Sequence, residues 1–146
     1  MLHGALATAD LAPFRVVMLP APDINIVCYV LTHPELGSLR QLNDFNQRVY
    51  QELSLARPGG APEYIITRTR LKTPMYDGAV DPILSALGTV TTSQWKAAGD
   101  EGLVVLRSTV MDPFLAEASP APDHVTGLIN AIRRAAQTAF EEMEER

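Results

Sequence analysis

The spacing of apolar residues in the first half of the chain predicts two strands followed by a helix. β-Branched runs at 14–19 and 24–31 predict the strands, because the short segment between them holds two prolines and a turn-forming aspartate. Ser38 and Gln41 then form a capping box, and apolar residues recur every three or four positions after it. This spacing predicts an amphipathic helix over 38–54.

The second half of the chain predicts further strands and helices. A glycine- and proline-rich loop at 57–62 leads into a strand at 64–71, in which Arg68 and Arg70 share one face. The other predicted elements are short helices at 81–88 and 93–98, a strand at 103–111 and a long helix with Asp123 as its N-cap.

These elements predict a small α+β domain. Its sheet has three to four strands, antiparallel or mixed, and helices cover one face. Residues 1–13 lack a clear period and are expected to form a weakly structured lead-in to a domain at 14–145. A length of 146 residues fits this single domain, spanning 1–146.

Charge and hydropathy narrow the classes of function. The chain has 12 basic and 17 acidic residues, and the arginines are scattered, so we expect no nucleic-acid partner. No apolar run approaches the roughly 20 residues that a membrane-spanning helix needs, and no secretion signal is evident, so we expect no membrane contact and a cytoplasmic location.

Most catalytic motifs are missing from the sequence. It has no Gly-x-Ser-x-Gly elbow and no glycine-rich phosphate loop. His3, His33 and His124 have no ligand partners at metal-binding spacing, so no metal site is expected. The only cysteine, Cys28, lies in an apolar run and is interpreted as a core residue.

Arg107 is the exception, because it interrupts the apolar strand at 103–111. Alternation places it on the same face as Leu103, Val105 and Met111. One interpretation is structural: the stem lies on the sheet while the head reaches solvent or pairs with an acid. The other is that the guanidinium binds a carboxylate through two parallel hydrogen bonds.

Arg68 and Arg70 leave the same two interpretations open. They could add to a carboxylate site beside Arg107. Alternatively, two arginines at a spacing of two form a solvated face with weak local ion pairs.

Four segments in order resemble the C-terminal small domain of group II pyridoxal-phosphate-dependent amino-acid decarboxylases, the family of the glutamate, aromatic and diaminobutyrate decarboxylases. The resemblance covers about residues 15–140 and depends on the order and spacing of all four segments. They are Pro22-Asp23-Ile24-Asn25-Ile26-Val27-Cys28-Tyr29, Leu42-Asn43-Asp44-Phe45-Asn46-Gln47-Arg48-Val49-Tyr50, Thr67-Arg68-Thr69-Arg70-Leu71 and Val105-Leu106-Arg107-Ser108-Thr109-Val110-Met111-Asp112-Pro113.

The resemblance implies an antiparallel sheet packed against a large domain that holds pyridoxal phosphate. It also implies that Arg107, in the last strand, binds the α-carboxylate of the substrate and that the domain helps to close the active site. No catalytic or cofactor-binding residue of the family falls on this chain. In the family the cofactor lysine follows a histidine, whereas Lys72 follows Leu71 and Lys96 follows Trp95.

The chain is therefore expected to be a fragment or split part of a decarboxylase, inactive alone and unable to bind pyridoxal phosphate covalently. Its expected partners are the large cofactor domain, in the same or a separate chain, and further copies in a homo-oligomer such as a dimer. Self-association is expected through an uncovered face with Leu103, Val105 and Met111. The alternative is a non-catalytic interaction module that keeps the small-domain fold.

Overall fold

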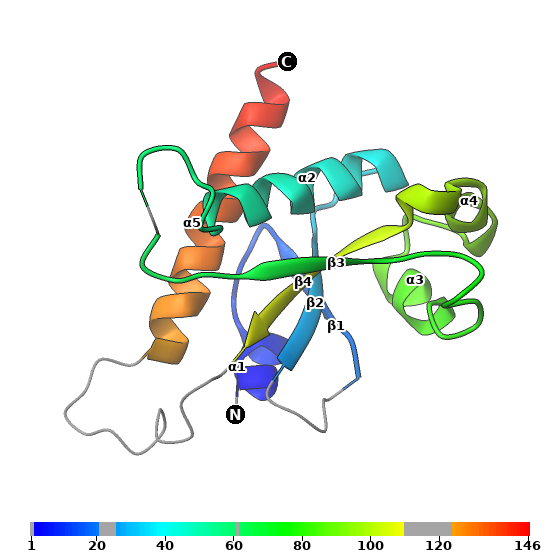
Figure 1. The fold of residues 1–146 in the computed structure, drawn as a ribbon, viewed down its shortest axis with the longest axis horizontal. Helices are drawn as coiled ribbons and strands as arrows, with labels where there is room; N and C mark the ends of the chain where they lie inside the picture. The colour runs from blue at the N-terminus through cyan, green and yellow to red at the C-terminus, as the bar shows by residue number, and fades with distance from the viewer. Residues whose placement is uncertain (1, 21–25, 61, 110–123) are drawn as a thin grey trace.

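The computed structural model describes residues 2–20, 26–60, 62–109 and 124–146 (Figure 1). Within these ranges the strands form a four-stranded antiparallel sheet in the order β1-β2-β4-β3, which confirms the predicted α+β class. The elements are α1 (Leu2–Thr8), β1 (Arg15–Met18), β2 (Ile26–Thr32), α2 (Leu39–Glu52), β3 (Thr67–Leu71), α3 (Asp81–Leu87), α4 (Thr92–Ala97), a short 3-10 turn (Gly99–Glu101), β4 (Leu103–Thr109) and α5 (His124–Glu144).

Residues 2–8 form helix α1, where the sequence predicts a weakly structured lead-in. Leu2 and Leu6 lie one turn apart and are buried in the main core. The Nε2 atom of His3 lies 3.1 Å from the carbonyl oxygen of Leu19, just after β1. Packing against β1 stabilises a helix that is too short to persist alone, so local periodicity did not reveal it.

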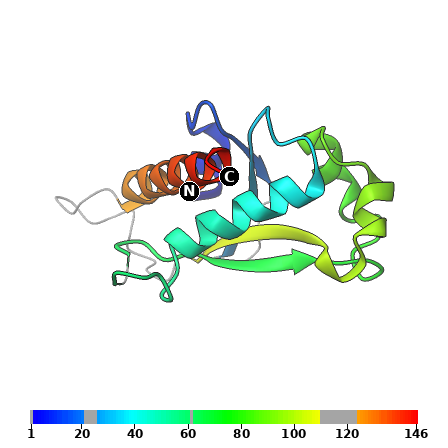
Figure 2. The ribbon, with the colours of Figure 1, turned by 90° about the horizontal axis from the view of Figure 1, so that it is seen from above.

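Helices α2 and α5 pack against each other, and α2 lies along the sheet (Figure 2). Helix α2 begins after Ser38, whose hydroxyl accepts a hydrogen bond from the Gln41 backbone N–H at 3.2 Å, as the capping box predicts. Tyr29, Leu31 and Leu106 are fully buried on the face of the sheet that α2 covers. We call this the helix-covered face.

Two buried asparagines fasten α2 to the sheet. Asn46 accepts a hydrogen bond from the Leu31 N–H at 3.0 Å and donates one to the Leu31 carbonyl at 2.8 Å. Asn43 donates to the Gly102 carbonyl at 2.8 Å and accepts from the Val104 N–H at 2.9 Å. These amides satisfy backbone groups of β2 and of the segment entering β4 that would otherwise be buried without partners.

The opposite face is not bare, because α3 and α4 cover one half of it. The Trp95 indole N–H donates to the Leu71 carbonyl at 2.9 Å, and buried residues of both helices belong to the main core. Leu103 and Val105 have 0% of their surface exposed, so the expected uncovered apolar face is wrong at these positions. Met111, also expected there, lies outside the described residues. Helices therefore pack on both faces rather than on one.

Several predicted boundaries shift by a few residues. The third strand begins at Thr67 rather than at residue 64, and Tyr64 instead packs beside α5, near the ring of His124. Gly88 ends α3 in a left-handed conformation, as expected of a C-cap glycine. The predicted N-cap Asp123 lies outside the described residues. No helix in the described ranges is long and apolar enough to cross a membrane.

Candidate functional site

Arg107 lies in β4, an inner strand of the sheet. Its register partners are Cys28 on β2 and Thr67 on β3. Directly paired residues of antiparallel strands project from the same face, so these three side chains form one row across the sheet, on the face opposite α2. We call it the Arg107 row. It confirms the predicted alternation along 103–109.

The Arg107 row lies where the covered half of this face gives way to an open half. Toward α3 and α4, the neighbouring Val30 and Val105 are fully buried. In the other direction Ile26 is half-buried and Thr109 is exposed. Arg107 is itself half-buried at this border.

No carboxylate of the described residues forms an ion pair with Arg107. Arg48 on α2 shows the contrast, because its guanidinium binds Asp44 at 3.1 Å and Glu142 at 3.0 Å. Within the described ranges, the acid-paired form of the structural interpretation therefore does not hold for Arg107.

Cys28 is paired with Arg107 in the strand register and projects from the same face. Burial raises the pKa of Cys28 above its ordinary value, and the positive charge of Arg107 offsets part of that increase. The thiol is therefore uncharged at neutral pH. Cys28 packs against the core as expected, but it is only half-buried and also faces the site.

Arg68 and Arg70 do not join Arg107. Since Thr67 shares the row with Arg107, both arginines project from the helix-covered face. Arg68 stacks over the Tyr50 ring of α2, with its guanidinium carbon 5.0 Å from the ring centroid. Arg70 donates to the carbonyl oxygen of Glu101 at 2.7 Å. The hypothesis that they add to the Arg107 site is wrong. Thr67 is the residue paired with Arg107, and side chains alternate between faces along a strand, so Arg68 and Arg70 project from the other face.

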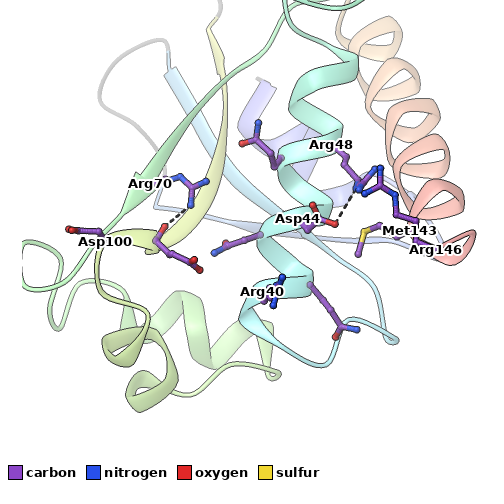
Figure 3. Close-up of a pocket in the computed structure, with 11 residues that line it drawn as sticks. Arg40, Asp44, Arg48, Arg70, Asp100, Met143 and Arg146 are labelled. Carbon is purple, nitrogen blue, oxygen red and sulfur yellow. Dashed lines mark hydrogen bonds and ion pairs between the residues drawn. The ribbon is translucent and has the colours of Figure 1, made fainter.

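A cavity of about 690 Å³ lies between α2, the end of β3, the 3-10 turn and the C-terminal end of the chain (Figure 3). Arg107, Cys28 and Thr67 are not among its lining residues. Its walls carry both signs of charge, and Figure 3 marks the ion pair between two of the lining residues, Arg48 and Asp44. Because arginines and acidic residues are mixed along its walls, the charge of this cavity does not favour either an anionic or a cationic ligand. The lining residues are Arg40, Gln41, Asn43, Asp44, Gln47, Arg48, Arg70, Asp100, Glu101, Met143 and Arg146.

The lysines of this chain do not fit a covalent pyridoxal-phosphate site. Lys72 is exposed, and the Lys96 side chain is 52% exposed and pairs with Asp77 at 3.8 Å. A lysine that forms a Schiff base is normally activated by a desolvated pocket or a neighbouring cation, and neither Lys72 nor Lys96 lies in such a pocket.

His33 is buried against the rings of Phe14 and Phe140, so its ring packs in the core.

The fold and site define a small α+β domain that carries Arg107 at the edge of the open half of one sheet face. A family model described as "Tyrosine decarboxylase, C-terminal" matches residues 4–136. The chain belongs to this family of decarboxylase C-terminal domains, which confirms its resemblance to the group II decarboxylases. The family implies pyridoxal phosphate in the complete enzyme and suggests a partner domain that binds it. A search of curated proteins found no match.

Proposed function

We propose that this domain supplies the substrate-carboxylate contact of a pyridoxal-phosphate-dependent amino-acid decarboxylase and helps to close its active site. The observation that carries the proposal is the position of Arg107. Arg107 is half-buried at the border of the open half of the sheet face and has no carboxylate partner among the described residues.

A guanidinium suits this task because its planar fork matches the two oxygens of a carboxylate. Arg107 belongs to β4, which is hydrogen-bonded to a strand on each side. Its backbone is therefore part of a rigid sheet rather than of a loop. The open half of the face, which includes Ile26 and Thr109, would lie against the cofactor-binding domain. Closure would then bring Arg107 to the substrate.

Pyridoxal phosphate, held by the partner domain, supplies the electron sink for decarboxylation when it is bound. The residues of this chain bind and orient the substrate and exclude water at the closed interface. The family's name makes tyrosine the first substrate to test. The partner domain belongs to the same chain or to a separate one, and the assembled enzyme is a cytoplasmic homo-oligomer.

The proposal is tested by two variants in the complete enzyme. Arg107→Met removes both charge and fork, so kcat/KM should fall by about tenfold to a hundredfold, while the cofactor absorbance is unchanged. Arg107→Lys keeps the charge and loses the fork, so its loss should be smaller. Steady-state kinetics with tyrosine give the two values.

Arg40→Met is the matched control, because Arg40 is an exposed arginine on the outer side of α2. It should leave kcat/KM unchanged within about twofold. A folded Arg107→Met enzyme with normal kcat/KM would refute the proposed carboxylate contact.

A further inference from the structure

A large apolar side chain, Ile65, is exposed just before β3. It keeps 47% of its surface exposed, whereas the next residue, Ile66, keeps only 1%. The Ile66 backbone N–H donates to the Leu53 carbonyl, just after α2, at 2.9 Å. Ile66 therefore packs toward the helices, and Ile65 does not.

The alternation of contacts assigns Ile65 to the face that carries Arg107. Tyr64 packs beside α5, Ile66 packs next to the end of α2, and Arg68 stacks on a ring of α2. Successive side chains of an extended chain project from opposite faces. Ile65 therefore projects from the same face as Thr67, which is paired with Arg107.

The strand register places Ile65 close to Arg107. Thr67 is opposite Arg107, and continuing this antiparallel register by two residues sets Ile65 opposite Thr109. Ile26 is paired with Thr109 from the other side. These three residues form a second row beside the Arg107 row, which we call the isoleucine row. Diagonal neighbours in such a pair lie about 7–8 Å apart, a span that one amino-acid ligand can bridge.

The exposed position of Ile65 is fixed by its neighbours rather than by a loose loop. The Tyr64 ring lies against the backbone of α5 at Gly127, where a Cβ atom would collide with the ring. It also lies edge-on to the His124 ring, with the ring centroids 6.3 Å apart. With the Ile66 N–H bonded as well, the chain is held on both sides of Ile65.

The two rows together offer a charge and an apolar surface side by side. Arg107 has no carboxylate partner among the described residues, and Ile26 is half-buried while Ile65 is exposed. Binding sites for small molecules commonly combine apolar walls with a few charged groups that orient the ligand. The ligand that matches this pair carries a carboxylate at one end and an apolar group close to it.

We propose that Ile65 is a specificity-determining residue, and that the isoleucine row contacts the apolar side chain of the amino acid whose carboxylate binds Arg107. This inference rests on the proposed function of Arg107. It adds that this domain discriminates between substrates by their side chains. The competing occupant of the row is the cofactor-binding domain itself, which would cover the isoleucines whatever substrate is bound.

Two probes without an amino group test the proposal in the complete enzyme. 3-Phenylpropionate carries a carboxylate and an aromatic ring, whereas succinate carries a second carboxylate in place of the ring. Ile65→Ala should weaken 3-phenylpropionate by about threefold to tenfold, because apolar contact is lost, and leave succinate within about twofold. Isothermal titration calorimetry gives both dissociation constants without turnover.

Ile65→Lys should change the preference rather than only reduce it. The ammonium group removes apolar contact and pairs with the second carboxylate of succinate, so the ratio of the two dissociation constants should shift by about tenfold toward succinate. Leu55→Lys is the matched control, because Leu55 is an aliphatic residue just after α2 that is 71% exposed. It should leave both constants within about twofold.

The outcomes distinguish this inference from the proposed function. Equal changes for both probes, or none, in the Ile65 variants would overturn the specificity role, and Ile65→Ala decides alone if Ile65→Lys does not fold. Arg107→Met should weaken both probes. If it does so while the Ile65 variants keep the wild-type ratio, only the specificity role fails. Unchanged binding of both probes to Arg107→Met would overturn the carboxylate contact and the specificity role together.

Discussion

The two faces of the sheet both carry arginines on their strands, but in different surroundings. On the helix-covered face, Arg68 stacks on a tyrosine ring and Arg70 binds a backbone carbonyl. On the opposite face, Arg107 is half-buried, with Cys28 beside it in the strand register and the exposed Thr109 two residues further along β4. The arginines of the helix-covered face are therefore used within the domain, whereas Arg107 has no carboxylate partner among the described residues.

Polar groups of the helix-covered face are largely used within the domain. The Tyr29 hydroxyl lies 2.9 Å from the Ser108 hydroxyl, and both are buried. Asn43 and Asn46 hold the backbone of the sheet to α2. Substitutions of these buried polar groups should change stability, whereas substitution of Arg107 should change kinetics.

The largest effect on stability is expected for Asn46→Leu. The variant leaves the Leu31 N–H and carbonyl buried without their partner, and each unsatisfied group costs about 1–3 kcal/mol. The free energy of unfolding in urea should therefore fall by about 2–4 kcal/mol.

Gln51→Leu is the control for this measurement, because Gln51 is exposed on the same helix. Its effect should stay within about 0.5 kcal/mol. An Asn46→Leu chain as stable as wild type would show that the buried amide does not fasten α2 to the sheet.

A pH effect of intermediate size is expected from Tyr29. Burial raises its pKa above the ordinary value of about 10, and the hydrogen bond with Ser108 only partly offsets this. Above about pH 10 the unfolded chain therefore binds fewer protons than the folded one, so the free energy of unfolding falls as pH rises. Cys28 contributes in the same direction, because its pKa is also raised.

Urea titrations at several pH values from about 8 to 11 should show the free energy of unfolding beginning to fall near about pH 10. Tyr29→Phe should be less stable at neutral pH, because Ser108 loses its partner, but its stability should depend less on pH in the alkaline range. Tyr76→Phe, at a partly exposed tyrosine, should keep the wild-type slope. Identical slopes for Tyr29→Phe and wild type would contradict this account.

Local sequence rules predicted the elements whose signals are local. The serine cap and apolar spacing predicted α2, and strand alternation placed Arg107 and Leu106 on opposite faces. Register between strands is set by tertiary pairing, so the sequence could not show that Arg68 and Arg107 lie on opposite faces. Helix α1 and the covering of Leu103 also depend on long-range packing, which short patterns do not encode.

The buried asparagines were missed for a related reason. An amphipathic pattern treats Asn43 and Asn46 as polar positions, although both face the sheet between apolar residues such as Leu42 and Phe45. Two asparagines three positions apart on the apolar side of a helix are the signal that could have revealed them. Each satisfies backbone groups that the sheet leaves unpaired at its boundary with α2.

The smallest effects are expected from Arg68 and Arg70, and they bear most directly on the comparison of the two faces. Arg68→Met removes a cation–π contact with Tyr50 worth about 0.5–1 kcal/mol, so the free energy of unfolding should fall by about that amount. Arg70→Met removes one hydrogen bond to the Glu101 carbonyl, at an exposed site where the change should stay below about 0.5 kcal/mol. In the complete enzyme both variants should keep kcat/KM within about twofold of wild type, because neither side chain shares a face with Arg107. A tenfold loss in either folded variant would place the substrate on the helix-covered face and would reverse the roles assigned to the two faces.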